Sequence, residues 1–334
     1  MSLTRRQTLR STALLGAGLA PSLLPGLLTP AHAQSGDFPN RAVRFIVPFP
    51  PGGPVDTTGR GMAVPLGEMW KQPTVIDNRA GAGGVVGAEM AAKQPADGYN
   101  LFVAAIHHAV MPSLRSKLPY DIENDFVAVS FAASFPVVLV AHPSVPAKNI
   151  AELIALDKKS PGTLTFGSSG NGGGTHLAGE LFNMHAGTKL RHIPYKGSAP
   201  AMNDVLGGQV QLMFSDAPTA IPQLKGNRVR ALGVASLTRS ALFPGVPTVA
   251  EQGVAGYEAY SWAALFAPKG TPPDIVKKIN ADVNKALNQP AIKQRLFEAG
   301  AEAKPGTSQQ MATFLRSEMT KWAQVVKAAN IQMD

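Results

Sequence analysis

One stretch decides the fold class of this chain: Val43-Arg44-Phe45-Ile46-Val47-Pro48-Phe49-Pro50-Pro51-Gly52-Gly53-Pro54-Val55-Asp56. Its first five residues have the apolar pattern of a buried strand, which Pro48 ends. Pro54 suits the first position of a helix, because an N–H at that position has no intrahelical partner anyway. A helix is therefore predicted from residue 55 to 70. A strand that turns through glycines into a helix is the repeating unit of an α/β sheet.

The same alternation continues along the rest of the chain. Further strands are predicted at residues 74–77, 101–104, 137–140, 164–166, 191–193, 211–214, 230–234 and 263–266. Further helices are predicted at 85–93, 150–158, 175–186, 199–206, 273–287 and 308–329. Strands that alternate with helices through short connections predict a parallel sheet with helices on both faces.

The alternation restarts after about residue 136, which predicts two α/β domains. The chain is expected to cross between them near Phe131–Pro136 and again near Pro244–Tyr260. The predicted division is a signal peptide at 1–33, the first part of domain 1 at 34–135, domain 2 at 136–246, and a return to domain 1 with the C-terminal helices at 247–334. Two domains joined by a two-crossing hinge form a clamp, with the ligand at the carboxyl ends of the strands.

The first 33 residues have the three parts of a secretory signal peptide: basic residues up to Arg10, an uncharged stretch at 11–28, and the small-residue site Ala31-His32-Ala33. The pair Arg5-Arg6 favours twin-arginine export, although Thr8 stands where a large apolar residue is usual. A membrane anchor is the alternative, but prolines interrupt the stretch and a span needs about 20 apolar residues. Cleavage after Ala33 is expected to leave a periplasmic protein.

The composition excludes several classes of function. The formal charge is +9 and would be +6 once three signal-peptide arginines are removed. The lysines and arginines are scattered, whereas a nucleic-acid-binding protein needs a concentrated basic stripe. Cysteine is absent, so a thiol nucleophile, a thiolate metal site and a disulfide are excluded. The histidines lack metal-ligand spacing, and neither a metal nor a cofactor is expected.

The first candidate ligand site is the loop between the first strand and the first helix. Its predicted ligand-binding residues are Phe49, Pro51, Gly52, Gly53 and Asp56. Glycines let a ligand approach the backbone, and the free N–H groups at a helix start attract anions. The carboxylate at position 56 would either stabilise the helix start or accept a hydrogen bond from the ligand, and spacing leaves both open.

The second candidate is the glycine-rich loop Gly167–His176, again between a strand and a helix. Its predicted binding residues are Ser168, Ser169, Gly170, Asn171 and Thr175. Open backbone amides with hydroxyl and amide side chains predict an anion cradle, and the alternative is a flexible turn capped by the threonine. Single residues at three other strand ends complete the predicted site: His107, Tyr195 and Asp216.

Enzyme signatures are weak in this sequence. The run Gly81–Gly87 resembles a dinucleotide-binding fingerprint, but Val86 replaces the third glycine and the run follows the second strand. No serine has the G-x-S-x-G surroundings of a hydrolase nucleophile. The chain is therefore predicted not to be an enzyme, and a periplasmic hydrolase or transferase is the less favoured alternative.

Several motifs keep a fixed order and spacing from Phe38-Pro39 to the C-terminus. They are Val47-Pro48-Phe49 with Gly52, Gly53 and Asp56; Asn78-Arg79 with Gly81-Ala82-Gly83-Gly84; Asp97-Gly98-Tyr99; Leu118-Pro119-Tyr120-Asp121; His176-Leu177-Ala178-Gly179-Glu180; Ile193-Pro194-Tyr195-Lys196-Gly197; Pro247-Thr248-Val249-Ala250-Glu251; and Phe266-Ala267-Pro268-Lys269-Gly270-Thr271-Pro272. Over about 300 residues the chain resembles the Bug-type substrate-binding proteins of tripartite tricarboxylate transporters.

The resemblance implies a type II periplasmic-binding-protein fold and capture of a small organic carboxylate for the membrane components of such a transporter. Family members hold carboxylates largely through backbone amides and ordered waters, and the two loops with the rims at His107 and Asp216 are the matching positions. A monomer is expected. An extracytoplasmic ligand sensor with the same fold is the alternative function.

Two departures from the family pattern bear on the ligand. Prolines at 50, 51 and 54 replace the usual alanine or glycine and donate no N–H. The third strand ends in Ala104-Ala105-Ile106-His107, where threonine or asparagine is common. We therefore expect a more apolar pocket, suited to an aromatic carboxylate or a medium-chain dicarboxylate rather than to citrate.

Overall fold

The computed structural model describes residues 38–332. The predicted signal peptide and its cleavage site lie outside this range. Within the range, no helix has both the length and the apolar character needed to cross a membrane.

The chain alternates between strands and helices as predicted. The strands are β1 (Val43–Val47), β2 (Thr74–Asn78), β3 (Asn100–Ala105), β4 (Phe126–Ala141), β5 (Thr165–Ser168), β6 (Arg191–Pro194), β7 (Leu212–Asp216), β8 (Arg230–Val234), β9 (Tyr260–Pro268) and β10 (Glu302–Ala303). The helices are α1 (Pro54–Trp70), α2 (Val85–Ala92), α3 (Ile106–Leu114), α4 (Ile150–Lys159), α5 (Gly174–Ala186), α6 (Ser198–Leu206), α7 (Ala217–Lys225), α8 (Pro273–Leu287), α9 (Pro290–Glu298) and α10 (Ser308–Ala328), with a 3₁₀ turn η2 at Ala82–Gly84.

Three helices were not predicted. Helix α3 continues directly from β3, and its N-cap Ala105 has no side chain that could signal a helix start. Helix α7 begins in a segment interpreted as a turn, although Pro218 lies in its first turn and Asp216 caps it. Helix α9 is a short segment after Gln289. The missed helices lack the long apolar periodicity on which the sequence-based assignment relied.

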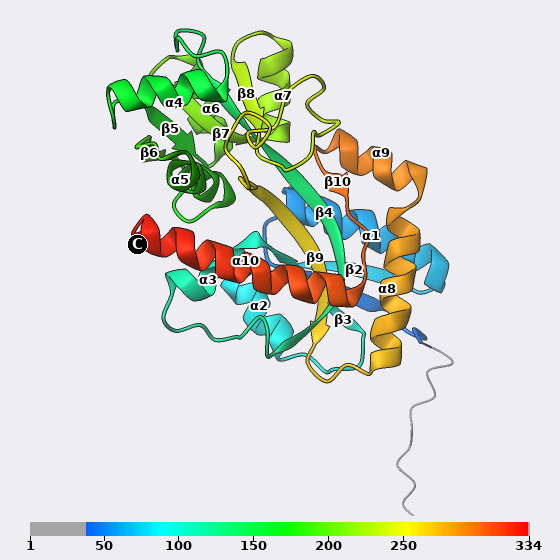
Figure 1. The fold of residues 1–334 in the computed structure, drawn as a ribbon. Helices are drawn as coiled ribbons and strands as arrows, with labels where there is room; N and C mark the ends of the chain where they lie inside the picture. The colour runs from blue at the N-terminus through cyan, green and yellow to red at the C-terminus, as the bar shows by residue number, and fades with distance from the viewer. Residues whose placement is uncertain (1–37, 333–334) are drawn as a thin grey trace, which may run out of the picture. The chain divides into compact units, whose positions relative to one another are not determined.

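The sheet contains two groups of parallel strands. Its order is β2-β1-β3-β9-β4-β7-β5-β6, and β8 and β10 pair with β4. β1 is parallel to β2 and β3, and β5 is parallel to β6 and β7. The long strands β9 and β4 join the groups through antiparallel pairs, so the two groups run in opposite directions. Figure 1 shows β4 and β9 extending side by side between the two groups.

The first crossing between domains is predicted near Phe131–Pro136. These residues form the middle of the 16-residue strand β4, which pairs with β9 and with β7 of the second group. Their side chains are mostly buried, and their backbone pairs with β9. The predicted strand at 137–140 is the second part of the same strand, where β7 and β8 replace β9 as its partners.

Apolar side chains on alternate strand positions build cores on both faces of the sheet. In β1, Phe45 packs on the face covered by α1 and α8, whereas Ile46 packs on the face covered by α2, α3 and α10. In β7, Phe214 belongs to the same core as Ile46, whereas Met213 belongs to a third core with side chains of α6 and α7. This period of two is what a sheet covered on both faces requires.

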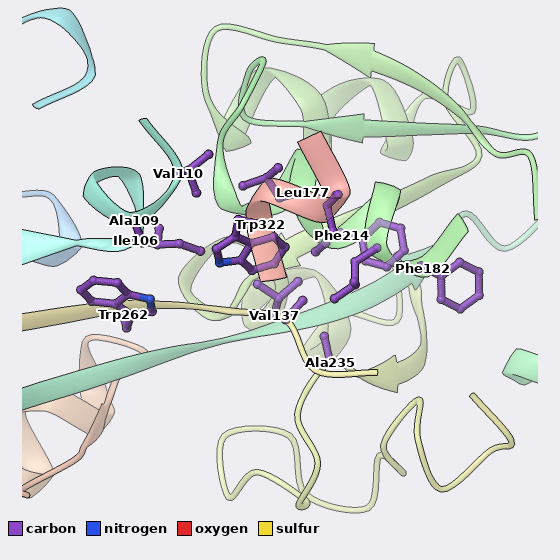
Figure 2. Close-up of a cluster of buried hydrophobic side chains, with 14 of the residues drawn as sticks. Ile106, Ala109, Val110, Val137, Leu177, Phe182, Phe214, Ala235, Trp262 and Trp322 are labelled. Carbon is purple, nitrogen blue, oxygen red and sulfur yellow. The ribbon is translucent and has the colours of Figure 1, made fainter. Parts of the chain in front are cut away.

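The largest core spans both groups of strands. Trp322 of α10 is fully buried in it. Figure 2 shows this indole with side chains of α3, such as Val110, on one side and Leu177 and Phe214 on the other. Helix α10 therefore packs against elements of both groups.

The glycine run that resembled a dinucleotide fingerprint has a structural role. Gly81, Gly83 and Gly84 have φ values of 150°, 67° and 98°, which disfavour side-chain-bearing residues. Gly87 brings α2 against the end of β1, where an added Cβ would lie 2.7 Å from Pro48 Cα and 2.9 Å from Arg79 O. These glycines allow the η2–α2 segment to approach the first strand closely.

We therefore predict that Gly87→Ala lowers the free energy of unfolding by about 1–3 kcal/mol, since backbone must shift to admit the methyl group. Gly61→Ala is the matched control, because this helical glycine has only an ordinary contact, 3.6 Å from Leu296 Cδ2. The control should be neutral or stabilising by up to about 1 kcal/mol. Urea denaturation of both variants measures the difference, and equal stabilities would contradict the packing argument.

Candidate ligand-binding site

A pocket of about 420 Å³ lies where the two groups of strands meet. It is lined by Phe49, Pro50, Pro51, Gly53, Pro54, Val55, Ala105, Ile106, His107, Phe135, Ser169, Gly174, Thr175, Asp216, Ser261 and Trp262. The predicted site residues in this lining are Phe49, Pro51, Gly53, His107, Ser169, Thr175 and Asp216. The sequence thus predicted lining residues from both loops, together with His107 and Asp216 of the three single residues at other strand ends.

Four helices begin at this pocket. The lining includes the N-caps or first residues of α1 (Gly53), α3 (Ala105), α5 (Gly174) and α7 (Asp216). The first N–H groups of a helix have no intrahelical acceptor, and the helix dipole adds roughly half a positive charge at this end. Among the described residues that line the pocket there is no lysine or arginine. An anion here would be held by helix N-termini instead of cationic side chains.

Asp56 lies outside the pocket lining and holds the first loop together. Its Oδ2 accepts hydrogen bonds from the Gly52 amide and from Arg60 Nε, both at 2.9 Å, and its Oδ1 accepts from Asn78 Nδ2 at 2.8 Å. Burial alone would raise the pKa of this carboxyl, but these hydrogen bonds outweigh it and lower the pKa. Of the two roles left open by the sequence, the geometry favours the structural one, which shapes the loop around Gly53.

The second loop uses most of its own donors internally. The amide of Ser169 donates to Thr175 Oγ1 at 2.9 Å, and the amide of Gly170 donates to Ser168 Oγ at 3.2 Å. The amide of Gly173 donates to the carbonyl of Gly170 at 3.3 Å. The loop amides are therefore not an open cradle, and the donors that remain for a ligand are those in the first turn of α5, at Gly174 and Thr175.

The other predicted residues that do not line the pocket have identifiable positions. The side chain of Ser168 is fully buried, with its Oγ 2.5 Å from His192 Nε2. Asn171 is exposed. Tyr195 donates to Asp204 Oδ2 at 2.6 Å, and burial together with this carboxylate raises its pKa to about 12. These side chains face the protein interior or solvent, which spacing along a loop cannot reveal.

Asp216 is the one charged side chain among the described residues of the lining. Its Oδ1 caps α7 by accepting from the Thr219 amide at 3.1 Å, and its Oδ2 accepts from Ser198 Oγ at 2.6 Å. The carboxylate is thus directed to its own helix start, where the dipole stabilises it. It also limits how closely a second anionic group of a ligand can approach α7.

His107 forms part of the pocket wall with an uncharged imidazole ring. It lies in the first turn of α3, beside Phe49 with a ring-centroid distance of 5.0 Å, and its buried Nδ1 has no hydrogen-bond partner. Burial lowers its pKa to about 4. The neighbouring His108 is completely buried, accepts from the Ala105 amide at 3.0 Å, and has its pKa lowered to about 4, chiefly by burial.

The sequence missed the floor of the pocket. Phe135 comes from β4, and Ser261 and Trp262 come from β9, which are the two strands that join the sheet groups. The sequence places Phe135 in a crossing between domains, and it predicts the strand of Ser261 and Trp262 only from residue 263. No local signal distinguishes such residues, because they reach the pocket through long-range strand pairing.

The fold and the pocket together define a class: a two-part α/β solute-binding protein with its site where the carboxyl ends of the strands face each other. A family model described as the tripartite tricarboxylate transporter family receptor matches residues 59–331, and the chain belongs to this family. The predicted type II periplasmic-binding-protein fold is thereby confirmed, and the solved neighbours include the periplasmic binding protein BugD.

Individual relatives are similar over nearly their whole length. Protein BugT of Bordetella pertussis is 37% identical over 326 residues, which cover 97% of this chain and 98% of BugT. Rpa4515 of R. palustris, solved with adipate, is 36% identical with a TM-score of 0.75, covering 88% of this chain and 99% of that one. MatC of Rhodopseudomonas palustris, solved with malate, is 32% identical with a TM-score of 0.71, covering 86% and 100%.

The buried histidines predict how stability depends on pH. In the unfolded chain they take up a proton near pH 6.5, whereas folded His107 and His108 stay neutral until about pH 4. The unfolded state therefore binds more protons between these values, so stability should fall as the pH falls from 7 to 5, by up to ~1.4 kcal/mol per pH unit for each such histidine.

Urea denaturation at pH 7, 6 and 5 measures this slope. His107→Leu should make it shallower, because the variant lacks one of the groups that titrate only in the unfolded state. A slope that is zero in the wild type, or unchanged in the variant, would contradict the assignment of a neutral imidazole at position 107.

Proposed function

We propose that this protein captures a small organic carboxylate in the 420 Å³ pocket and delivers it to the membrane components of a tripartite tricarboxylate transporter. The observation that carries the proposal is the convergence of four helix N-termini on a pocket whose described lining has no cationic side chain. Such a site selects an anion that accepts several backbone hydrogen bonds. The family membership and the adipate and malate bound to two relatives support it.

The walls of the pocket favour a ligand with an apolar body. Phe49, Val55, Ile106 and the prolines of the first loop present carbon surface, and Phe135 and Trp262 lie at the floor. A carboxylate at the helix starts with an aliphatic or aromatic body against these walls uses both features. Citrate would place three anionic groups in a pocket that already contains the Asp216 carboxylate. An aromatic carboxylate or a medium-chain dicarboxylate is therefore the proposed ligand class.

Capture by closure of two domains is part of the proposal. The predicted domains, 34–135 with 247–334 and 136–246, would rotate about β4 and β9, and a ligand that contacts both stabilises the closed state by its differential affinity. We also propose export by the twin-arginine route, cleavage after Ala33 and action as a monomer in the periplasm. A sensor that passes ligand occupancy to another membrane protein would use the same clamp.

We propose binding without turnover. The arrangement nearest to a nucleophile with its base is Ser168 with His192, at 2.5 Å. Ser168 is fully buried and does not line the pocket, and burial, together with His176, lowers the pKa of His192 to about 3, so that it is a poor base at neutral pH. These features argue against hydrolysis of a ligand held in the pocket.

A thermal-shift series with adipate, malate, benzoate and citrate tests the proposal. Binding to the folded state raises the melting temperature in proportion to RT ln(1 + [L]/Kd), and we expect adipate or benzoate to give a larger shift than citrate. A larger shift with citrate would contradict the proposed ligand class. No shift with any organic acid in a wider panel would contradict carboxylate capture itself.

Ser169→Ala tests the second loop within the same series. Its hydroxyl lies at the pocket, 2.9 Å from Thr175 Oγ1. Its loss should weaken binding of the best acid by about 1–3 kcal/mol, the usual effect of an unpaired buried partner. Ser317→Ala, at an exposed position of α10, is the control and should bind as the wild type does. Equal affinities of the two variants in calorimetry would remove this hydroxyl from the site.

A further inference from the structure

Two histidines lie stacked beneath the second pocket loop. The rings of His176, on α5, and His192, on β6, are 3.6 Å apart between centroids and nearly parallel, at 9°. Phe166 of β5 lies next to both, with centroid distances of 6.5 Å and 5.1 Å. His176 is only 5% exposed, and neither histidine lines the pocket. The pair therefore has no direct access to a ligand.

Each histidine is hydrogen-bonded to a different part of the second loop. The Gly172 amide donates to His176 Nδ1 at 3.1 Å, and His192 Nε2 shares a hydrogen bond with Ser168 Oγ at 2.5 Å. Ser168 Oγ in turn accepts from the Gly170 amide at 3.2 Å. The residues between and beyond these anchors, Ser169 and Thr175, line the pocket.

The hydrogen bond from Gly172 indicates which ring nitrogen of His176 acts as the acceptor. Its Nδ1 accepts a hydrogen bond, so the ring proton lies on Nε2, which faces Glu180 Oε1 at 3.7 Å, one helical turn further along α5. A second proton on Nδ1 would remove the acceptor for the Gly172 amide and place a cation against the stacked ring of His192. The loop geometry therefore depends on Nδ1 of His176 as the acceptor for the Gly172 amide.

We propose that His176, supported by its stack on His192, is a positioning residue for the pocket: by accepting the Gly172 N–H it holds the second loop so that the first turn of α5 presents Gly174 and Thr175 to the bound anion. The expected contribution of His176 to ligand affinity rests on the proposed function. The expected contribution of His176 to the position of the loop does not require any ligand.

Two substitutions separate the acceptor from the stack. His176→Asn keeps an acceptor near the position of Nδ1 but loses the ring, and His176→Phe keeps an aromatic ring on His192 but loses the acceptor. We expect His176→Phe to weaken adipate binding by at least about fivefold, since an unpaired buried amide remains. His176→Asn should stay within about threefold of the wild type. His185→Asn, at an exposed position of the same helix, is the control.

Amide hydrogen exchange of the ligand-free protein provides the readout that a loss of global stability would not mimic. In His176→Phe, exchange of Gly172 and its loop neighbours should accelerate while the amides of the β4 core stay protected; in His176→Asn the loop should stay protected. His176→Leu, which also lacks the acceptor for the Gly172 amide, serves if His176→Phe does not fold.

The outcomes distinguish the inference from the proposed function. Unchanged loop exchange in His176→Phe, or in His176→Leu if that variant has to be used, would overturn the positioning role. So would adipate affinity that falls equally in His176→Asn and His176→Phe. If the wild type binds no organic acid, the proposed function fails, but accelerated exchange confined to the loop would still support His176 as its anchor.

Discussion

The structure depends on two groups of parallel strands that run toward each other in one sheet. In register, Ala105 at the end of β3 pairs with Ala263, which pairs with Ala133 of β4, whereas Asp216 at the end of β7 pairs with Val137. The carboxyl ends of the two groups thus face each other across about four residues of β4, or roughly 13 Å of strand. A helix follows each of the strands β1, β3, β5 and β7, so the N-termini of α1, α3, α5 and α7 meet at one pocket.

Under the proposed function, this convergence holds an anion without a cationic side chain. Asp216 occupies the start of α7, so its charge is balanced by that helix and by Ser198. The starts of α3 and α5 have no acidic side chain in their first turns, and each has roughly half a positive charge, whereas Asp56 lies in the first turn of α1 and pairs with Arg60. Pro54 removes one donor from α1, which shifts the balance of hydrogen bonding toward α3 and α5. In the proposed function, these amides would recognise the carboxylate, and the apolar walls would distinguish one acid from another.

The sequence predicted the α/β class, most strands and both pocket loops, because alternating apolar runs and glycine-rich turns are local features. It did not predict which loop side chains face the pocket: Asp56 turns to Gly52, and Ser168 turns to His192, through contacts formed only in the folded chain. It also missed the floor at Phe135, Ser261 and Trp262, since strand pairing between distant segments places them there. The domain boundaries at 135 and 246 stay a prediction.

A crystal structure of the protein with adipate would test the central claim most directly. The account predicts a carboxylate with its oxygens about 3 Å from backbone nitrogens in the first turn of α5 and of α1 or α3. It also predicts that no lysine or arginine nitrogen lies within about 4 Å of that carboxylate, the distance at which an ion pair forms. A carboxylate held by a guanidinium or ammonium group, or bound away from the helix starts, would contradict it.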